Sequence, residues 1–237
     1  MKKIMIAASA ALCAAVGFGE IESANTVGYT TTTARQGYTL FVPAFSDVGT
    51  EGLDIQKIKP NTEATGVNIQ TFTATAEGET LYYYVPAGKA GAGWYTNPRG
   101  TAATYASKTF AKGEGFMAYF PSENITFNVS GEVGLEAKTL ENVRSGYTLM
   151  GNFRPVEYSI QKILPATDTT GVNLQTFTAT AEGETLYYYV PAGKAGAGWY
   201  TNPRGTAATF ADKVFTAGEG FMIYLPSSMN VTFQSAE

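Results

Sequence analysis

An internal repeat constrains the fold of this chain more than any other feature of its sequence. The segment from Gly66 to Thr104 recurs as Gly171 to Thr209, and the two copies differ at one of 39 positions, where Ile69 becomes Leu174. The interval of 105 residues matches a small domain and is too long for the unit of a solenoid. The sequence therefore predicts two tandem copies of one domain.

Shorter motifs extend the repeat on both sides of this block. Upstream, Gly37-Tyr38-Thr39-Leu40 recurs at residues 146–149, and downstream, Gly113-Glu114-Gly115-Phe116 recurs at residues 218–221. We define the first repeat as residues 20–131 and the second repeat as residues 132–237. Residues 1–19 precede both repeats.

The first 19 residues have the composition of a secretory signal peptide. Lys2 and Lys3 give a positive start, an alanine-rich apolar run follows, and the small residues Gly17 and Gly19 suit a cleavage site. The apolar run is shorter than a bilayer requires. We therefore expect a secreted chain, extracellular or at the cell surface, with no membrane span.

Composition excludes several kinds of site. The chain has no histidine, and its one cysteine, Cys13, lies in the expected leader, which excludes disulfides, a histidine-based catalytic triad and a zinc site of these residues. Without Lys2 and Lys3, 14 basic residues face 20 acidic residues, a net charge of −6. This balance is unfavourable for binding nucleic acid, which requires a basic surface.

Alternating apolar residues predict β-strands. From Phe116 to Phe120, positions 116, 118 and 120 share one face, and Phe221, Ile223 and Leu225 keep that face apolar in the second repeat. No long helical period is present. The predicted class is all-β, with two tandem homologous domains that each form a β-sandwich or open barrel of seven or eight strands.

Turn-forming residues divide these strands. Glu77-Gly78 predicts a hairpin, and Pro86 is expected to end the strand that follows or to lie at a sheet edge. The segment from Ala87 to Gly93 is nearly all glycine and alanine, which predicts a flexible loop. One short helical turn is expected at residues 53–58.

Several of these motifs resemble a known set of proteins. The opening A-N-T-V-G-Y from Ala24 to Tyr29, the G-Y-T-L and G-E-G-F motifs, and the closing I-T-F with Gly131-Glu132-Val133 follow its pattern. The set comprises secreted bacterial β-repeat proteins with the motifs A-N-x-V-G-Y, G-[FYW]-x-L, G-x-G-F and [IV]-T-F-x-G-E-V. It has no assigned reaction, so the resemblance implies an extracellular or surface role. The asparagine-proline that often follows G-[FYW]-x-L is absent here.

Aromatic residues provide a candidate ligand face. Tyr82, Tyr83 and Tyr84 are consecutive, so either Tyr83 faces outward or Tyr82 and Tyr84 do. Flat rings beside amide and guanidinium donors can bind a cell-surface polysaccharide or a partner protein, whereas cross-strand packing of the same rings would only stiffen the sheet. The candidate face consists of Tyr82, Tyr84, Trp94, Tyr95 and Arg99, and of their counterparts Tyr187, Tyr189, Trp199, Tyr200 and Arg204.

The strand that is predicted to open the first repeat suggests a structural role. If it completed the preceding repeat, the last repeat would lack a strand that the next molecule supplies, and copies would join head to tail into a filament or matrix. Alternatively, each opening strand belongs to its own repeat, which gives a monomer with two complete domains. The candidate assembly strand comprises Asn25, Thr26, Val27, Gly28, Tyr29, Thr30 and Thr31.

The sequence predicts neither an enzyme nor a cofactor. The only tight acidic pairs in the repeated block are Glu77 with Glu79 and Glu182 with Glu184, and each pair flanks a hairpin glycine, where solvated charges are expected. We therefore expect an extracellular structural protein whose main partner is a further copy of itself. A tandem module that binds carbohydrate or another surface ligand is the alternative.

Overall fold

The structure is a computed structural model, and it describes residues 27–33, 36–72, 79–177 and 184–236. The expected leader and the Glu77-Gly78 turn lie outside these residues. In the first repeat the strands are β1 (Val27–Thr33), β2 (Gly37–Phe41), β3 (Gly52–Asp54), β4 (Ile58–Pro60), β5 (Asn68–Phe72), β6 (Glu79–Gly88), β7 (Gly91–Tyr95), β8 (Thr109–Ala111), β9 (Phe116–Phe120) and β10 (Thr126–Glu132). In the second repeat they are β11 (Lys138–Val143), β12 (Gly146–Gly151), β13 (Tyr158–Ser159), β14 (Ile163–Pro165), β15 (Asn173–Phe177), β16 (Glu184–Gly193), β17 (Gly196–Tyr200), β18 (Val214–Phe215), β19 (Gly220–Leu225) and β20 (Met229–Phe233).

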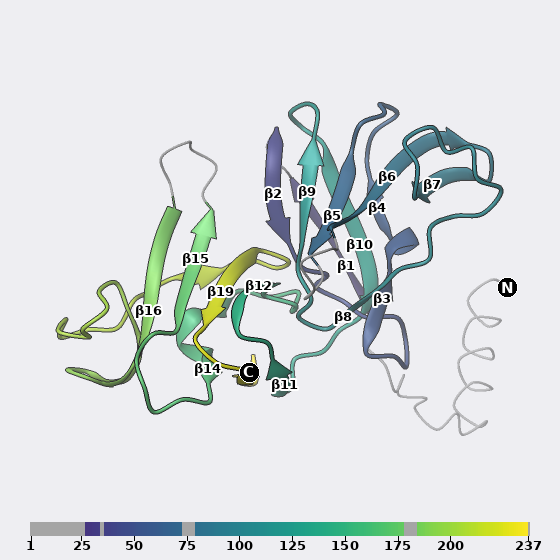
Figure 1. The fold of residues 1–237 in the computed structure, drawn as a ribbon. Helices are drawn as coiled ribbons and strands as arrows, with labels where there is room; N and C mark the ends of the chain where they lie inside the picture. The colour runs from purple at the N-terminus through teal and green to yellow at the C-terminus, as the bar shows by residue number, and fades with distance from the viewer. Residues whose placement is uncertain (1–26, 34–35, 73–78, 178–183, 237) are drawn as a thin grey trace, which may run out of the picture.

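The strands of both repeats form sheets of the same order. The first repeat has a five-stranded sheet, β2-β9-β5-β6-β7, a three-stranded sheet, β1-β10-β4, and the pair β3-β8. The second has β12-β19-β15-β16-β17, β11-β20-β14 and β13-β18 (Figure 1). The all-β class is confirmed. The strands outnumber the seven or eight expected per repeat, because strands of two or three residues are too short to show alternation.

A short 3₁₀ helix precedes the third strand of each three-stranded sheet. The helices are η1 (Ile55–Lys57) and η2 (Ile160–Lys162), and η1 confirms the turn expected at residues 53–58. The side chain of Asp54 accepts a hydrogen bond from the Gln56 N–H and so caps η1. In the second repeat, Ser159 caps η2 in the same way.

The core of each repeat lies between its five-stranded and three-stranded sheets. Phe116, Ala118 and Phe120 of β9 are buried, whereas the two residues between them are partly exposed, as their alternation predicts. Phe127 of β10 packs against Phe120 with ring centroids 4.9 Å apart, so the smaller sheet covers the inner face of the larger one. A corresponding apolar cluster fills the second repeat.

The glycine-rich and alanine-rich segment 87–93 is a tight β-hairpin and not the predicted flexible loop. β6 continues through Pro86 to Gly88, where the chain turns into β7. The register of this pair shifts just before Gly88, and such irregular stretches tolerate proline. A Cβ on Gly93 would lie 2.6 Å from the ring of Tyr105, so glycine here makes room for a ring.

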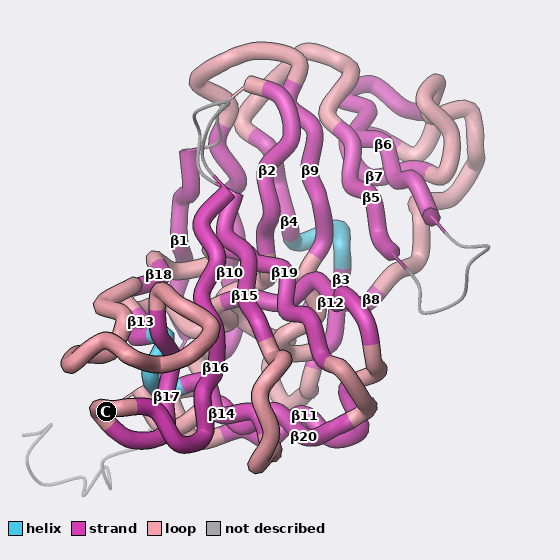
Figure 2. The backbone as a smooth tube through the Cα atoms, turned by 60° about the vertical axis from the view of Figure 1, so that its left-hand side comes forward, coloured by secondary structure: helices cyan, strands magenta, loops and turns pink. Residues whose placement is uncertain are grey.

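The two repeats contact each other reciprocally through their shared motifs. The G-E-G loop at 113–115 lies against β12, where the Gly115 N–H donates to the Leu149 carbonyl at 3.0 Å. The equivalent loop at 218–220 lies against β2, where the Val42 N–H donates to the Gly218 carbonyl at 3.1 Å. β2 and β19 are in contact at this junction, and the tube in Figure 2 shows the second repeat below the first. In Figure 1, β2 extends upward from the junction and β19 lies below it.

Glycine is required on both sides of this junction. A Cβ on Gly115 would lie 2.9 Å from the backbone of Leu149, and one on Gly220 would lie 2.7 Å from the backbone of Leu40. Such distances are too short for any side chain. The junction also buries Val42 of the first repeat in the core of the second. The two repeats are therefore packed against each other and are not independent domains joined only by a linker.

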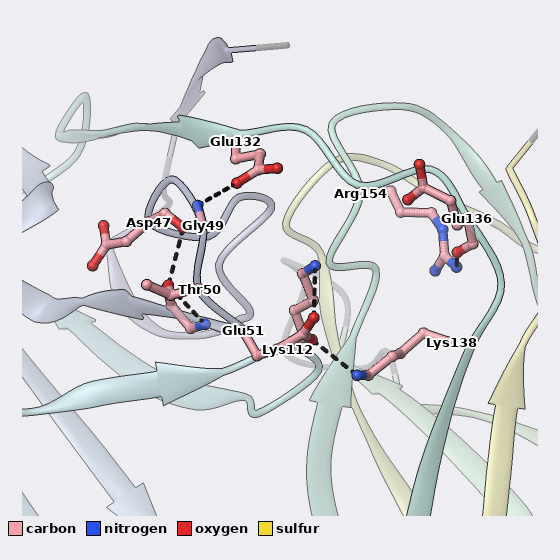
Figure 3. A network of polar contacts seen from close by, with 10 residues as sticks. Asp47, Gly49, Thr50, Glu51, Lys112, Glu132, Glu136, Lys138 and Arg154 are labelled. Carbon is pink, nitrogen blue, oxygen red and sulfur yellow. Dashed lines mark hydrogen bonds and ion pairs between the residues drawn. The ribbon is translucent and has the colours of Figure 1, made fainter. Parts of the chain in front are cut away.

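Two ion pairs, both with Glu51, lie at the junction, as Figure 3 shows. Glu51 lies 2.8 Å from Lys138 of the second repeat and 3.7 Å from Lys112 of the first. The hydrogen bond from Lys138 is the main cause that lowers the pKa of the Glu51 carboxyl. Because its side chain is 69% exposed, solvent screens these pairs, and they contribute less to stability than the buried contacts.

Candidate functional site

The candidate assembly strand forms the edge of a sheet. β1 pairs with β10 along its whole length, from Val27 opposite Glu132 to Thr33 opposite Thr126, with no break in register. Because β10 closes the first repeat, the opening strand completes its own repeat, and β11 pairs with β20 in the same way. This structure therefore has the second of the two arrangements considered, in which each opening strand belongs to its own repeat. Asn25 and Thr26 lie outside the described residues.

β1 presents an uncharged, partly apolar surface. Val27 is 62% exposed and Tyr29 is 75% exposed, and the strand sequence V-G-Y-T-T-T-T has no charge and no proline. Across the face of the three-stranded sheet, Val27, Tyr29 and Val48 line a groove of about 510 Å³, which Lys57 and Lys59 also line. Thr31 Oγ1 donates to Asn128 Oδ1 of β10 at 2.8 Å. A flat, uncharged edge of high β-propensity is able to add a further strand.

The equivalent edge of the second repeat is protected against such addition. β11 carries Lys138 and Glu141, and its register against β20 shifts between Leu140 and Val143. Asn142 at this irregularity has a φ of 52°, in the left-handed region. Charges and bulges are two of the devices by which natural sheets block edge pairing. β1 has neither, so the two repeats differ at the position where association is expected.

The predicted ligand face is largely part of the core. Trp94 and Tyr95 are fully buried, and so are their counterparts Trp199 and Tyr200. The Trp94 Nε1 donates to the Ile58 carbonyl at 2.6 Å, and the indole packs edge-on against neighbouring aromatic rings of the core. The interior thus uses both the polar and the apolar surfaces of this side chain. The prediction that these rings face a ligand is wrong for this structure.

The three consecutive tyrosines adopt one of the two arrangements left open by their sequence. Tyr83 points outward. Tyr82 is 8% exposed and packs in the core, and Tyr84 packs against this core. Burial raises the pKa of the Tyr82 and Tyr84 hydroxyls. Tyr187 and Tyr189 are likewise inward, and Arg99 and Arg204 are exposed but lack the exposed rings expected beside them.

A cross-strand row of tyrosines lies on the outer face of each five-stranded sheet, and sequence reasoning missed it. Strand register places Tyr38 opposite Tyr119, Tyr119 opposite Asn68, and Asn68 opposite Tyr83. We call these four residues the first tyrosine row. The second tyrosine row, from the corresponding strands, consists of Tyr147, Tyr224, Asn173 and Tyr188.

The two tyrosine rows have nearly the same geometry. The ring centroids of Tyr38 and Tyr119 lie 5.1 Å apart, as do those of Tyr147 and Tyr224. Gln70 Nε2 donates to the Tyr38 hydroxyl at 3.2 Å, and the second row has the same bond at the same distance. Tyr38 is 47% exposed and Tyr147 is 44% exposed, so each row presents open aromatic surface.

Arg154 is a buried cation that sequence reasoning also missed. Its Nη2 donates to the carbonyls of Glu136, at 2.7 Å, and Gln234, at 3.0 Å, and the guanidinium lies 4.6 Å from the centroid of the Tyr158 ring. Burial lowers the pKa of this guanidinium. Phe45 occupies the equivalent position of the first repeat. Arg154 therefore has a structural role, because it ties the segment after β20 to the segment before β11 (Figure 3).

Among residues 27–33, 36–72, 79–177 and 184–236, no group of three or more acidic, histidine or cysteine side chains is placed to hold a metal ion. Glu77 and Glu182, and the side chains of Glu79 and Glu184, lie outside what the structure describes. No helix in the described part of the chain is long and apolar enough to cross a membrane.

No family model, curated protein or solved structure matches this chain. Its function must therefore be inferred from the edge strand and the outer sheet faces described above.

Proposed function

We propose that this chain is an extracellular structural protein that associates with further copies of itself through the β1 edge. The observation that carries the proposal is the contrast between the two equivalent edges. β1 is flat, uncharged and exposed at Val27 and Tyr29, whereas β11 is charged and bulged. An unprotected edge of this kind is a template for main-chain pairing with another chain.

The partner that fits this edge is β1 of a second copy. Antiparallel pairing centred on Thr30 sets Tyr29 of each copy opposite Thr31 of the other, and brings no charged side chains together. Aromatic residues opposite β-branched residues are favourable cross-strand pairs. Such a contact is two-fold symmetric and closes on itself, so by itself it yields a dimer. Head-to-tail growth by strand donation would require β1 to leave β10.

The test is to place a charge on this edge and measure association. Thr31→Lys puts two like charges near each other across the proposed dimer, while Thr139→Lys adds the same charge to β11. The two changes are matched, because Thr31 and Thr139 each have one cross-strand side-chain bond, to Asn128 at 2.8 Å and to Thr232 at 2.9 Å. Sedimentation velocity over a range of concentrations measures the association.

The expected result is a wild-type dimer, a Thr139→Lys variant that dimerises as the wild type does, and a Thr31→Lys variant at least about tenfold weaker, because like charges at an interface cost several kcal/mol. A wild-type chain that stays monomeric at every concentration would remove the proposal. So would a Thr31→Lys variant that dimerises as strongly as the wild type.

A further inference from the structure

We infer that the two tyrosine rows are binding sites for a neutral, unbranched polysaccharide chain laid across the strands. The rows lie on the five-stranded sheets, while the β1 edge belongs to a three-stranded sheet. The inference therefore stands whether or not the chain associates with itself. It places the ligand on the opposite face of the sheet from Tyr82, Tyr84 and Trp94, which were first considered.

The outer face agrees between the two repeats more closely than the inner face does. Outside the near-identical block, the outward residues Tyr38, Met117 and Tyr119 recur unchanged as Tyr147, Met222 and Tyr224. On the inner face Phe116 recurs as Phe221, but Phe41, Ala118 and Phe120 are replaced by Met150, Ile223 and Leu225. Substitutions of exposed residues usually cost less stability than substitutions in the core. If stability alone acted, the outer face would therefore differ between the repeats more than the inner face.

Other exposed faces of the two repeats have diverged. On the three-stranded sheets, Tyr29 corresponds to Leu135, whose carbonyl accepts from the Ala236 N–H at 2.8 Å in the same register. In the third strand, Lys59 corresponds to Leu164. Tyr38 and Tyr119 lie outside the near-identical block, so copying of that block does not explain why they recur as Tyr147 and Tyr224. A ligand that both rows bind does explain it.

The chemistry of the rows suits a neutral sugar chain. Four side chains on adjacent strands, separated by steps of about 4.8 Å, form a strip roughly 14 Å long. Their rings offer flat apolar faces, and the tyrosine hydroxyls can exchange hydrogen bonds with sugar hydroxyls. The rows contain no charged side chain, and the chain carries a net charge of −4. An acidic polysaccharide would be repelled.

The test uses the full chain and glycans of defined composition. Retention is measured on particles of cellulose, chitin and β-1,3-glucan, with alginate as the acidic comparison. Tyr38→Thr and Tyr147→Thr are made singly and together, because threonine keeps β-propensity while it removes the ring. Tyr105→Thr is the matched control, since Tyr105 is 40% exposed and lies outside both rows and outside the β1 edge. Urea unfolding checks that each variant is folded.

The expected result is retention on a neutral glycan that the control keeps and that the double variant loses. A single variant should bind at least about tenfold more weakly, because the gain from two linked sites disappears. Tyr38→Phe, which keeps the ring, should bind as the wild type does. Failure of the wild type on all three neutral glycans would overturn the inference, and so would a folded double variant that is retained as strongly as the wild type.

Discussion

Replacing Gln56 by methionine should destabilise the chain by about 3 kcal/mol. The Gln56 amide lies along the open edge of β7, where its Oε1 accepts from the Trp94 N–H at 3.0 Å. Its Nε2 donates to the carbonyls of Trp94, at 3.2 Å, and Ala106, at 2.9 Å. Methionine has a similar length but makes none of these bonds, so the substitution tests the polar contacts with little change in volume.

The magnitude follows from counting the groups that would lose their partners. The Trp94 carbonyl keeps a hydrogen bond from the Ala106 N–H at 2.8 Å, so it stays satisfied. Within the described part of the chain, the Trp94 N–H and the Ala106 carbonyl have no hydrogen-bond partner besides Gln56, and both residues are buried. A buried group left without a hydrogen bond costs about 1–3 kcal/mol. Two such groups give the total of about 3 kcal/mol.

Urea unfolding followed by tryptophan fluorescence measures this cost. With a slope of about 1–3 kcal/mol per molar urea, the midpoint should fall by roughly 1–3 M. Gln70→Met is the control, because Gln70 makes its side-chain bond on the exposed outer face. Gln161→Met should repeat the effect in the second repeat, where the same three bonds occur. Equal midpoints for Gln56→Met and Gln70→Met would refute this reasoning.

Three further changes test other parts of the structure. Burial raises the pKa of the Tyr158 hydroxyl to about 12, whereas the pKa of tyrosine in the unfolded chain is about 10. The free energy of unfolding should therefore fall as the pH rises from about 10. Urea midpoints of Tyr158→Phe should not show this part of the loss of stability. Gly93→Ala places a Cβ 2.6 Å from Tyr105 and should cost about 1–3 kcal/mol by overpacking; an unchanged urea midpoint would contradict this. Glu51→Gln should cost less than about 1 kcal/mol at pH 7, and less still when the pH falls below the lowered pKa of Glu51, because the carboxylate is then protonated; thermal unfolding at both pH values checks the difference.

The sequence predicted the elements whose pattern is local. Alternation at residues 116–120 identified the buried face of β9, and the repeat itself indicated that both halves would have the same strands. It could not predict the fate of Trp94, because the acceptor of its Nε1, the Ile58 carbonyl, lies on a strand distant in sequence. A tryptophan beside tyrosine and arginine has the same local pattern on a ligand face and in a core.

The candidate sites depend on the register between neighbouring strands, and amino-acid composition does not determine that register. The row from Tyr38 to Tyr83 joins strands far apart in the sequence, and a shift of one residue in any pair would turn its side chains to the other face. The partner of the opening strand was also ambiguous, since the closing strands of both repeats have similar sequences. Only the closure of each sandwich around its own core selects β10 as the partner of β1.

The burial of Val42 in the second repeat affects how the chain reaches its folded state during synthesis. The ribosome releases the first repeat before the second, so the nascent chain exposes this apolar side chain and the adjoining edge of β2 until residues 218–220 have emerged. During that interval, a first repeat can accept the second repeat of a neighbouring molecule with the same contacts. The reciprocal junction therefore provides a route to exchanged dimers when many chains are made close together.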